Sequence, residues 1–212
     1  MAFLRSSTGH DSALTIRGRN VWLRAALMAD YAPWAELRAM SREHLTPWEP
    51  QWQRDELSRS SFRRRVRHYQ REAREDMGYA FLIFADTDDQ LVGGLTVSNV
   101  RRGVTQTGVL GYWTGKPFAG RGYMTEAVRA VASFAFDTLH LHRLEAATMP
   151  NNLASIRVLE RNGFRREGFA RQLLRINGVW EDHVLHALLS DDERGDHARR
   201  MRSTVGAETS EA

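Results

Sequence analysis

The sequence contains no cysteine and only one lysine, Lys116, among its 212 residues. The absence of cysteine excludes disulfide bonds, thiolate zinc sites and a cysteine nucleophile. Hydrophobic runs are short as well, and none approaches the roughly 20 residues that a membrane-spanning helix needs. Residues 1–10 lack the apolar segment of a secretory signal. We therefore expect a soluble, cytoplasmic protein.

The length of the chain suits one ordinary domain. With 212 residues, of which 42% are hydrophobic, it can bury a substantial core. No internal repeat or second domain is visible, and both ends are polar. We expect a single domain from residue 13 to residue 190, with flexible tails at 1–12 and 191–212.

Almost every basic residue is an arginine, and the net charge is +4. Two interpretations are open: codon usage in a GC-rich genome, or a surface for anionic partners, because guanidinium groups bind phosphate in a bidentate fork. The segment Gln51 to Glu75 holds eight arginines against four acidic residues, a surplus equal to that of the whole chain. Helical spacing predicts one amphipathic helix here, whose apolar face is Phe62, Val66, Tyr69, Ala73 and Met77. Its arginines, Arg63, Arg64 and Arg67 among them, are a candidate contact for an anionic partner.

Hydrophobic patterns predict alternating strands and helices along the rest of the chain. Strands are expected at 20–24, 79–85, 91–100, 107–113, 143–149, 164–169 and 179–188. Helices are expected after Asp30, a candidate N-cap, and at 125–139 and 154–161. Short turns between the strands of 79–113 indicate an antiparallel meander. The fold class is therefore α/β in the broad sense, of the α+β kind.

A glycine-rich stretch between a predicted strand and a predicted helix is a candidate phosphate site. It runs from Gly115 to Ala127 and includes Gly120 and Gly122. Glycines at this place let backbone N–H groups converge on an anion at the positive end of the helix dipole. Two common phosphate loops are excluded by spelling, because no Gly-Lys-Ser/Thr follows and Thr125 stands where a dinucleotide fingerprint needs its third glycine.

The loop belongs to a longer pattern, in which Asn151-Asn152-Leu153-Ala154-Ser155 opens a short helix that ends at Asn162-Gly163. This composite resembles the GNAT N-acetyltransferases, whose corresponding loop binds the pyrophosphate of acetyl-CoA. The family motif, Gln/Arg-x-x-Gly-x-Gly/Ala, falls on Gly120 and Gly122. Pro117 stands where Gln or Arg is usual, which leaves Lys116 or Arg121 as the charged contact.

Further stretches are similar to the RimJ/RimL group of ribosomal-protein N-terminal acetyltransferases, and most of all to its RimJ members. They are His44-Leu45-Thr46-Pro47-Trp48-Glu49-Pro50, Ser98-Asn99-Val100-Arg101-Arg102-Gly103, Gly111-Tyr112, His142-Arg143, Met149-Pro150-x-Asn152 and Trp180-Glu181-Asp182-His183. The resemblance runs from about Val21 to Leu189. It implies a mixed, mostly antiparallel sheet flanked by helices, with central strands splayed around acetyl-CoA. It also implies acetyl transfer to the N-terminal residue, alanine, of a small-subunit ribosomal protein.

The same resemblance assigns candidate site residues. Contacts with acetyl-CoA are expected from Tyr112, Trp113, Phe118, Ala119, Gly120, Arg121, Gly122, Tyr123, Met124, Asn152 and Ser155. Ser155 is also the expected acid for the departing CoA thiolate. Trp48, Glu49 and Trp52 are expected to line the acceptor pocket.

Without a cysteine, direct attack of the acceptor amine on the thioester is the simpler mechanism. An α-amine has a pKa of roughly 7.7–8.0 and a lysine of roughly 10.4, so deprotonation at neutral pH costs about 1 and about 4 kcal/mol respectively. An α-amine acceptor therefore needs only a weak base. Glu145, on a central strand, and Glu49, which we also expect to hold the incoming ammonium, are the two candidates for this base.

The histidines do not suggest a metal. His183 and His186 are three residues apart on a predicted strand, hence on opposite faces, and we expect no metal cofactor. For Asp182-His183, strand packing is favoured over a catalytic role. Two alternatives to the main hypothesis stay open: acetylation of a small-molecule amine or antibiotic, and a ribosome- or RNA-binding module on the same scaffold.

Overall fold

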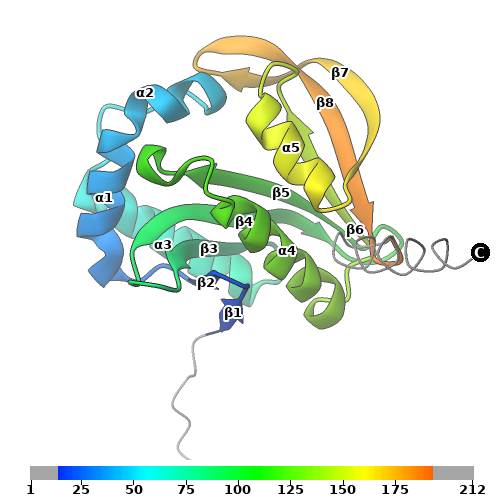
Figure 1. Cartoon of the computed structure of the whole chain (residues 1–212), viewed down its shortest axis with the longest axis horizontal. Coiled ribbons are helices and arrows are strands. Elements are labelled where there is room, and N and C mark those ends of the chain that lie inside the picture. Colours follow the sequence, from blue (N-terminus) through cyan, green and yellow to red (C-terminus); the bar gives the residue numbers. More distant parts are fainter. Residues whose placement is uncertain (1–13, 193–212) are drawn as a thin grey trace, which may run out of the picture.

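A computed structural model describes residues 14–192, and its centre is one eight-stranded sheet with the order β1-β2-β3-β4-β5-β6-β8-β7 (Figure 1). The strands are β1 (Thr15–Arg17), β2 (Val21–Arg24), β3 (Tyr79–Ala85), β4 (Leu91–Arg101), β5 (Thr107–Thr114), β6 (Arg143–Thr148), β7 (Arg165–Ile176) and β8 (Val179–Leu189). Neighbouring strands are antiparallel except β5 and β6. The expected mixed and mostly antiparallel sheet is confirmed.

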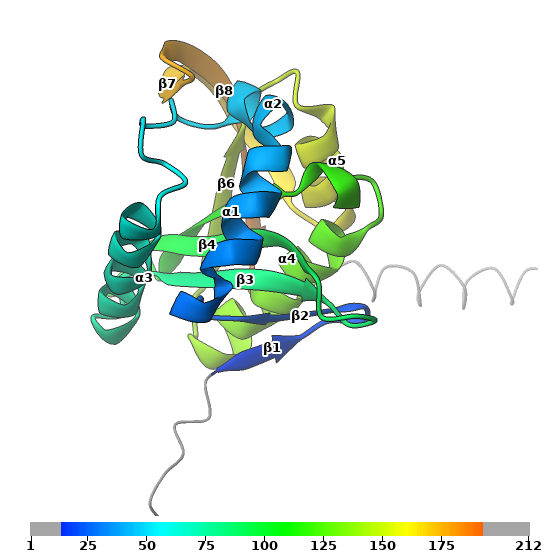
Figure 2. The ribbon, with the colours of Figure 1, turned by 90° about the vertical axis from the view of Figure 1, so that its left-hand side faces the viewer.

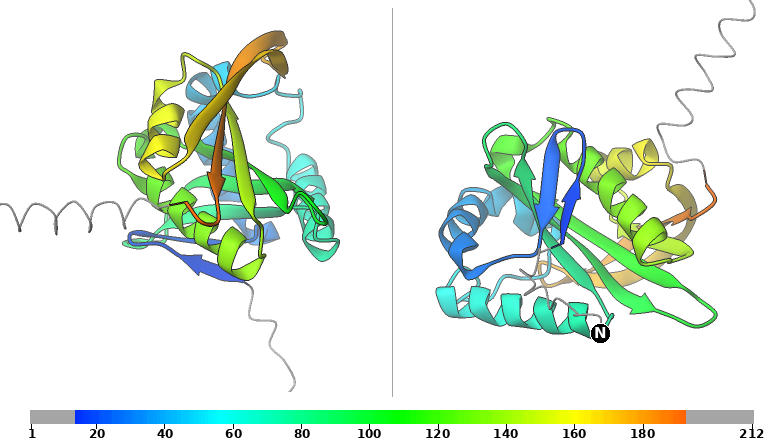
Figure 3. Two further views of the ribbon diagram at one scale, coloured as in Figure 1. Left: turned by 90° about the vertical axis from the view of Figure 1, so that its right-hand side faces the viewer. Right: turned by 90° about the horizontal axis from the view of Figure 1, so that it is seen from below.

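Helices cover both faces of the sheet (Figures 2 and 3). They are α1 (Tyr31–Met40), α2 (Arg42–Leu45), α3 (Arg59–Arg74), α4 (Tyr123–Ser133) and α5 (Leu153–Arg161), with short helical turns η1 (Met28–Asp30), η2 (Thr46–Trp48), η3 (Lys116–Phe118) and η4 (Phe134–Thr138). Successive side chains of a strand point to opposite faces, and β3 supplies two cores in this way. Ile83 packs with the apolar residues of α4, while Leu82 packs with those of α1 and α3.

The parallel strands β5 and β6 pair over only three positions. Thr107, Gly108 and Val109 lie opposite Arg143, Leu144 and Glu145. Beyond them β5 continues to Thr114 and β6 to Thr148 without pairing to each other. The two strands therefore splay, as the resemblance implied, and one edge of β5 is left open in the middle of the sheet.

The arginine-rich segment differs from its prediction at both ends. Helix α3 begins at Arg59, because Ser58 caps it by accepting a hydrogen bond from the Ser61 N–H at 3.1 Å. Residues 51–57 instead form a loop, and Met77 follows the helix with 53% of its surface exposed. The predicted helix was thus too long, although Phe62 is buried on its apolar face.

Other boundaries shift for local reasons. Asp30 occupies the N-cap position of α1 without capping it, because its carboxylate accepts hydrogen bonds from Arg24 and from the Leu27 N–H. The expected helix at 125–139 ends in the wide turn η4, and β7 is one continuous, bulged strand that runs well past the end expected at residue 169. At the β7–β8 turn, Asn177 and Gly178 have positive φ angles of 43° and 88°. A two-residue type I′ turn requires a positive φ at both positions.

The expected tail at 1–12 and residues 193–212 of the expected tail at 191–212 lie outside the described residues. Asp192 is described, and its carboxylate lies 2.9 Å from the Arg165 guanidinium. Among residues 14–192, no helix combines the length and the apolar content needed to cross a bilayer.

Candidate active site

Three cavities meet at one side chain, Tyr112. The loop cavity, of about 250 Å³, lies between the glycine loop and α5. The chamber, of about 410 Å³, lies between α1, α3 and the strands β3 to β5. The hairpin cavity, of about 340 Å³, lies between the splayed strands and the β7–β8 hairpin. Tyr112 lines all three, so this position joins three potential ligand sites.

The glycine loop is shaped for an anion. Gly120 and Gly122 have φ angles of 76° and 83°, and no atom lies within 4 Å of a Cβ placed on either residue. Gly122 directly precedes the first turn of α4, where free backbone N–H groups and the helix dipole favour a phosphate. Arg121 is exposed on the same loop.

Two further cations line the loop cavity that the sequence did not single out. Arg157 and Arg161 are one turn apart on α5, directly after the Asn152 cap. Their helical spacing was the signal that could have identified them. His44 lies on the opposite wall, where burial, together with the charge of Lys116, lowers its pKa.

The loop is fixed to the end of α1. The Lys116 N–H donates a hydrogen bond of 2.8 Å to the Oγ of Ser41, which is completely buried. Gly115 packs so closely on Leu37 that an added Cβ would lie 2.4 Å from its Cδ1. These contacts fix the position of the loop relative to α1.

Tyr112 and Ser155 form a pair of hydroxyl groups at the junction of the cavities. The Tyr112 Oη lies 2.8 Å from the Ser155 Oγ and donates a hydrogen bond of 3.2 Å to the Ser155 carbonyl. Ser155 is held in turn by Asn152, whose Oδ1 accepts the Ser155 N–H at 3.1 Å and caps α5. Burial raises the pKa of Tyr112 to about 12, against a smaller lowering by its bond to Ser155. The phenol therefore keeps its proton at neutral pH.

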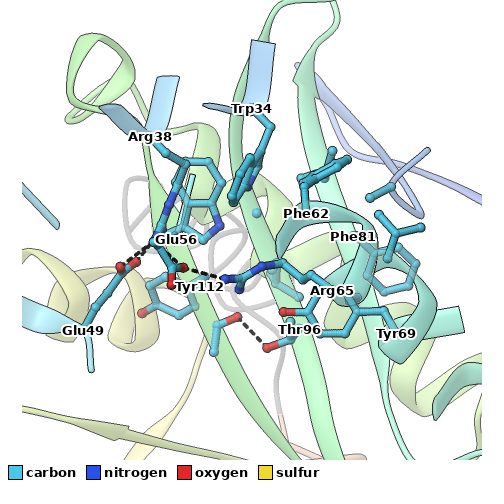
Figure 4. Close-up of a pocket in the computed structure, with 18 of the residues that line it drawn as sticks. Trp34, Arg38, Glu49, Glu56, Phe62, Arg65, Tyr69, Phe81, Thr96 and Tyr112 are labelled. Atoms are coloured by element: carbon cyan, nitrogen blue, oxygen red, sulfur yellow. Dashed lines mark hydrogen bonds and ion pairs between the residues drawn. The ribbon is translucent and has the colours of Figure 1, made fainter. Parts of the chain in front are cut away.

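The acceptor segment predicted around Trp48 forms a strap, residues 48–52, above the chamber. Glu49 is held by Arg38, whose two terminal nitrogens donate to its two oxygens at 2.7 and 2.8 Å (Figure 4). The Trp52 Nε1–H donates to the same carboxylate at 2.7 Å. Only 6% of the Arg38 side chain is exposed, and its guanidinium lies over the rings of Trp52 and Trp113 at 4.4 and 4.9 Å.

A second contact ties the strap to the far end of the sheet. The Asn177 N–H, in the β7–β8 turn, donates a hydrogen bond of 2.9 Å to the Glu49 carbonyl. Under the strap, Glu56 pairs with Arg65 at 2.5 Å, and aromatic side chains form the chamber wall (Figure 4). The strap thus spans the distance from α1 to the β7–β8 hairpin and covers the chamber.

Comparison with known proteins identifies this arrangement. The model of the acetyltransferase (GNAT) domain family matches residues 20–165, more than half of the chain. The chain belongs to the GNAT acetyltransferase family. The resemblance drawn from its motifs is confirmed.

Individual GNAT relatives cover nearly the whole described region. The probable N-acetyltransferase YjcK of Bacillus subtilis is 39% identical over 178 residues, which are 84% of this chain and 98% of that protein. The ribosomal protein uS5-alanine N-acetyltransferase of Escherichia coli is 34% identical over 168 residues, 78% of this chain and 87% of that protein. The structure of Mycobacterium smegmatis RimJ in complex with CoA-disulfide has a TM-score of 0.80 and 31% identity, over 90% of this chain and 94% of that one.

Of the three residues predicted to act in catalysis, this GNAT enzyme brings two to the cavities. Ser155 lines the loop and hairpin cavities, and Glu49 lines the chamber and the loop cavity. Glu145 lines none of the three and accepts a hydrogen bond of 2.8 Å from Arg143. The reason is its place on β6, where that strand is still paired with β5 at Val109.

The remaining predicted residues divide between the two sides of the GNAT site. Trp48 lines the loop and hairpin cavities, whereas Trp52 lines the chamber. Of the loop residues, Phe118, Gly120, Gly122, Tyr123 and Met124 line the loop cavity. Trp113 lines both the loop cavity and the chamber, and it packs toward α1. Ala119 is exposed on the loop.

The histidines separate as the strand period predicts. His183 lines the hairpin cavity, while His186 lies opposite Ala146, whose side chain belongs to the core under α4. Both histidines are 3% exposed. Within residues 14–192 no three His, Asp or Glu side chains are grouped so that they could hold a metal ion.

Proposed function

We propose that this enzyme transfers the acetyl group of acetyl-CoA to the N-terminal α-amine of a protein, alanine on a small-subunit ribosomal protein. The observation that carries the proposal is the Tyr112–Ser155 hydroxyl pair, at the point where the loop cavity meets the two cavities on the acceptor side. The identity with the uS5-alanine N-acetyltransferase of Escherichia coli supports the choice of acceptor.

Acetyl-CoA is the co-substrate that the loop cavity fits. The positive φ angles of Gly120 and Gly122 aim backbone N–H groups at a pyrophosphate. Arg157 and Arg161, which line the cavity, and Arg121, which is exposed on the loop, supply cations. The pantetheine arm then passes Asn152 and brings the thioester to Tyr112. The solved RimJ relative in complex with CoA-disulfide is consistent with this assignment.

The thioester carbonyl is polarised by the open edge of β5. Past Val109 this edge has no partner in β6, so its backbone N–H groups are available to an oxyanion. Attack by the neutral amine gives a tetrahedral intermediate, which collapses with cleavage of the C–S bond. Ser155, backed by the phenol of Tyr112, gives a proton to the departing thiolate.

The acceptor enters under the strap. A chamber of about 410 Å³ is much larger than a methyl side chain, so we infer that it also takes residues beyond the first alanine. A carboxylate offers about four lone-pair directions. In Glu49, three of these directions accept hydrogen bonds, two from Arg38 and one from Trp52, and one direction remains. We assign to Glu49 the positioning of the acceptor ammonium, with Trp48 and Trp52 as flanking walls.

The test is an acceptor comparison with purified enzyme and acetyl-CoA. Thiol release is measured with an Ala-starting peptide of ribosomal protein uS5, the same peptide blocked at its N-terminus but containing lysine, and a panel of small amines. We expect turnover of the free α-amine peptide alone. Turnover confined to a small amine would overturn the acceptor and favour the small-molecule alternative.

A binding module on the same scaffold makes a different prediction. In that case Ser155→Ala would leave the biological activity unchanged, whereas an enzyme loses turnover. We retain the arginine helix as a proposed rRNA contact through its exposed residues Arg63 and Arg67. Arg64 is a weaker candidate, because its guanidinium already pairs with Asp55 at 2.6 Å.

A further inference from the structure

The chemistry proposed above needs a group that takes a proton from the acceptor ammonium, and the predicted carboxylates serve it poorly. Glu49 is bound by Arg38 and Trp52, and Glu145 lies outside the three cavities. The base must face the splay between β5 and β6, where the thioester lies. The hairpin cavity borders this space.

His183 is the imidazole of that cavity. It projects from β8 into a space that also borders Ser155, Tyr112 and the diverging end of β6. The side chain is 3% exposed, and its place in the sheet is set by pairing with Ala170 of β7. A buried histidine at this position is therefore held rigidly beside the reaction site.

The hydrogen bond on one ring nitrogen fixes the chemistry of the other. The Nδ1 lies 2.9 Å from the Glu181 carbonyl oxygen, which can only accept, so Nδ1 carries the proton. In the neutral ring Nε2 then holds a lone pair. Among the described residues Nε2 has no hydrogen-bond partner. Unlike the Nδ1 of His186, it is not a fully buried atom.

We propose that His183 is the general base of this acetyltransferase, acting on the acceptor ammonium through a water in the hairpin cavity; the assignment rests on the proposed acetyl transfer to an amine. One proton of the ammonium passes to Nε2 and from the imidazolium to solvent. The neutral amine attacks the thioester, and the C–S bond breaks. The second proton from nitrogen replaces the one that the Ser155–Tyr112 hydroxyls give to the thiolate, so the products are the N-acetyl amide and CoA thiol.

The charged surroundings of His183 are few. Arg175 of β7 lines the same cavity, with its Nε donating to the Gly178 carbonyl at 3.0 Å. Glu181 lies two residues earlier on the same face of β8. From β5 the cavity receives the phenol of Tyr112, and from the strap it receives only the uncharged Trp48 and Pro50.

The experiment compares His183→Ala with His186→Gln, a matched control on the same strand. At pH about 7, we expect His183→Ala to lower kcat/KM for the acceptor about 100-fold, the usual effect of losing a general base. The deficit should shrink to under about 10-fold at pH about 9, because an α-amine with a pKa of roughly 7.7–8.0 is then mostly neutral. Added imidazole should restore part of the lost rate, and KM for acetyl-CoA should not change.

Several outcomes would overturn the assignment. A deficit that is equal at every pH and insensitive to imidazole indicates packing, as does an equal loss in His186→Gln. If His183→Ala unfolds, the same pH series on His183→Gln replaces it. If the wild-type enzyme acetylates only small amines, the proposed acceptor is wrong. The role of His183 can still be tested with those amines, because the base acts on whichever amine is turned over.

Discussion

The two sides of the site are built differently. On the side proposed to bind acetyl-CoA, the glycine loop, the start of α4 and the Asn152 cap each come from a short continuous stretch of sequence. On the proposed acceptor side, the strap needs Arg38 from α1, Trp113 from β5 and Asn177 from the hairpin to hold one residue, Glu49. The first side is encoded locally, and the second is assembled across the fold.

This difference predicts different responses to mutation. A change in the glycine loop should alter the binding of one ligand and little else. A change in the strap should disturb stability and acceptor binding together, because the same contacts that hold Glu49 also join α1 to the sheet edge.

The largest effect is expected from Arg38→Leu. It leaves the Glu49 carboxylate, 20% exposed, without its bidentate partner. Removing one member of a buried pair costs roughly 3–5 kcal/mol, and the partial exposure of Glu49 reduces this to about 2–3 kcal/mol. Urea unfolding should show that loss, together with a higher KM for the acceptor and an unchanged Kd for CoA.

Arg17→Leu is the control for this variant. Arg17 pairs with Asp86 at 3.4 Å, with 72% and 52% of the two side chains exposed. Exposed pairs contribute roughly 0–1 kcal/mol, so unfolding should barely change. Equal losses in the two variants would contradict the idea that the strap is held by a buried ion pair.

The same contrast explains what the sequence could predict. Gly120, Gly122, Asn152 and Ser155 form local patterns of fixed spacing, and their places were predicted correctly relative to the strand and helix boundaries. Arg38 was missed, because its partner is eleven positions away across a turn and a lone arginine on an apolar helix face has no motif. Its position one turn after Trp34 was the available signal.

Long-range pairing also explains the position of Glu145 outside the three cavities and the error in the bounds of the arginine-rich helix. Whether Glu145 reaches the site depends on where β5 and β6 stop pairing, which neither strand encodes by itself. Residues 51–57 have a composition that is compatible with a helix. However, Glu56 forms an ion pair with Arg65, and Glu49 forms one with Arg38, and these contacts hold the segment over the chamber as a loop. Tertiary contacts outweighed local propensity in both places.

The next largest effect is expected from Tyr112→Phe, which removes the phenol and keeps the ring. Loss of a proton donor typically slows the chemical step about 100-fold or more, so kcat should fall while the Kd for CoA stays constant. Because the pKa of Tyr112 is about 12, its acid form persists as pH rises, and wild-type kcat should show no decline from this group below about pH 10. A falling limb in that range which disappears in Tyr112→Phe would contradict the pKa assigned to the phenol. An unchanged kcat would remove Tyr112 from the proton relay.

A smaller effect is expected from Gly122→Val in the locally encoded loop. At a φ of 83° a side chain costs roughly 1–2 kcal/mol, which corresponds to about a tenfold weaker CoA affinity if the loop shifts to relieve it. Calorimetric titration of CoA measures this. Gly103→Val is the matched control, since Gly103 also has positive φ, 68°, and open space around it but lines none of the three cavities. Weakened CoA binding in the control would show that the loss is a general effect of stability.

The smallest effect on catalysis is expected from Arg63→Glu combined with Arg67→Glu on α3. Both side chains are exposed and line none of the three cavities, so kcat/KM on a free peptide should stay within about twofold and stability within about 0.5 kcal/mol. Co-sedimentation with ribosomes should fall, and more so at low salt, where phosphate contacts contribute most. Unchanged co-sedimentation would remove the rRNA contact and leave codon usage as the explanation of the arginines. The inner face of α3 already lines the chamber. A loss of peptide turnover would extend the acceptor side of the site to the outer face of this helix.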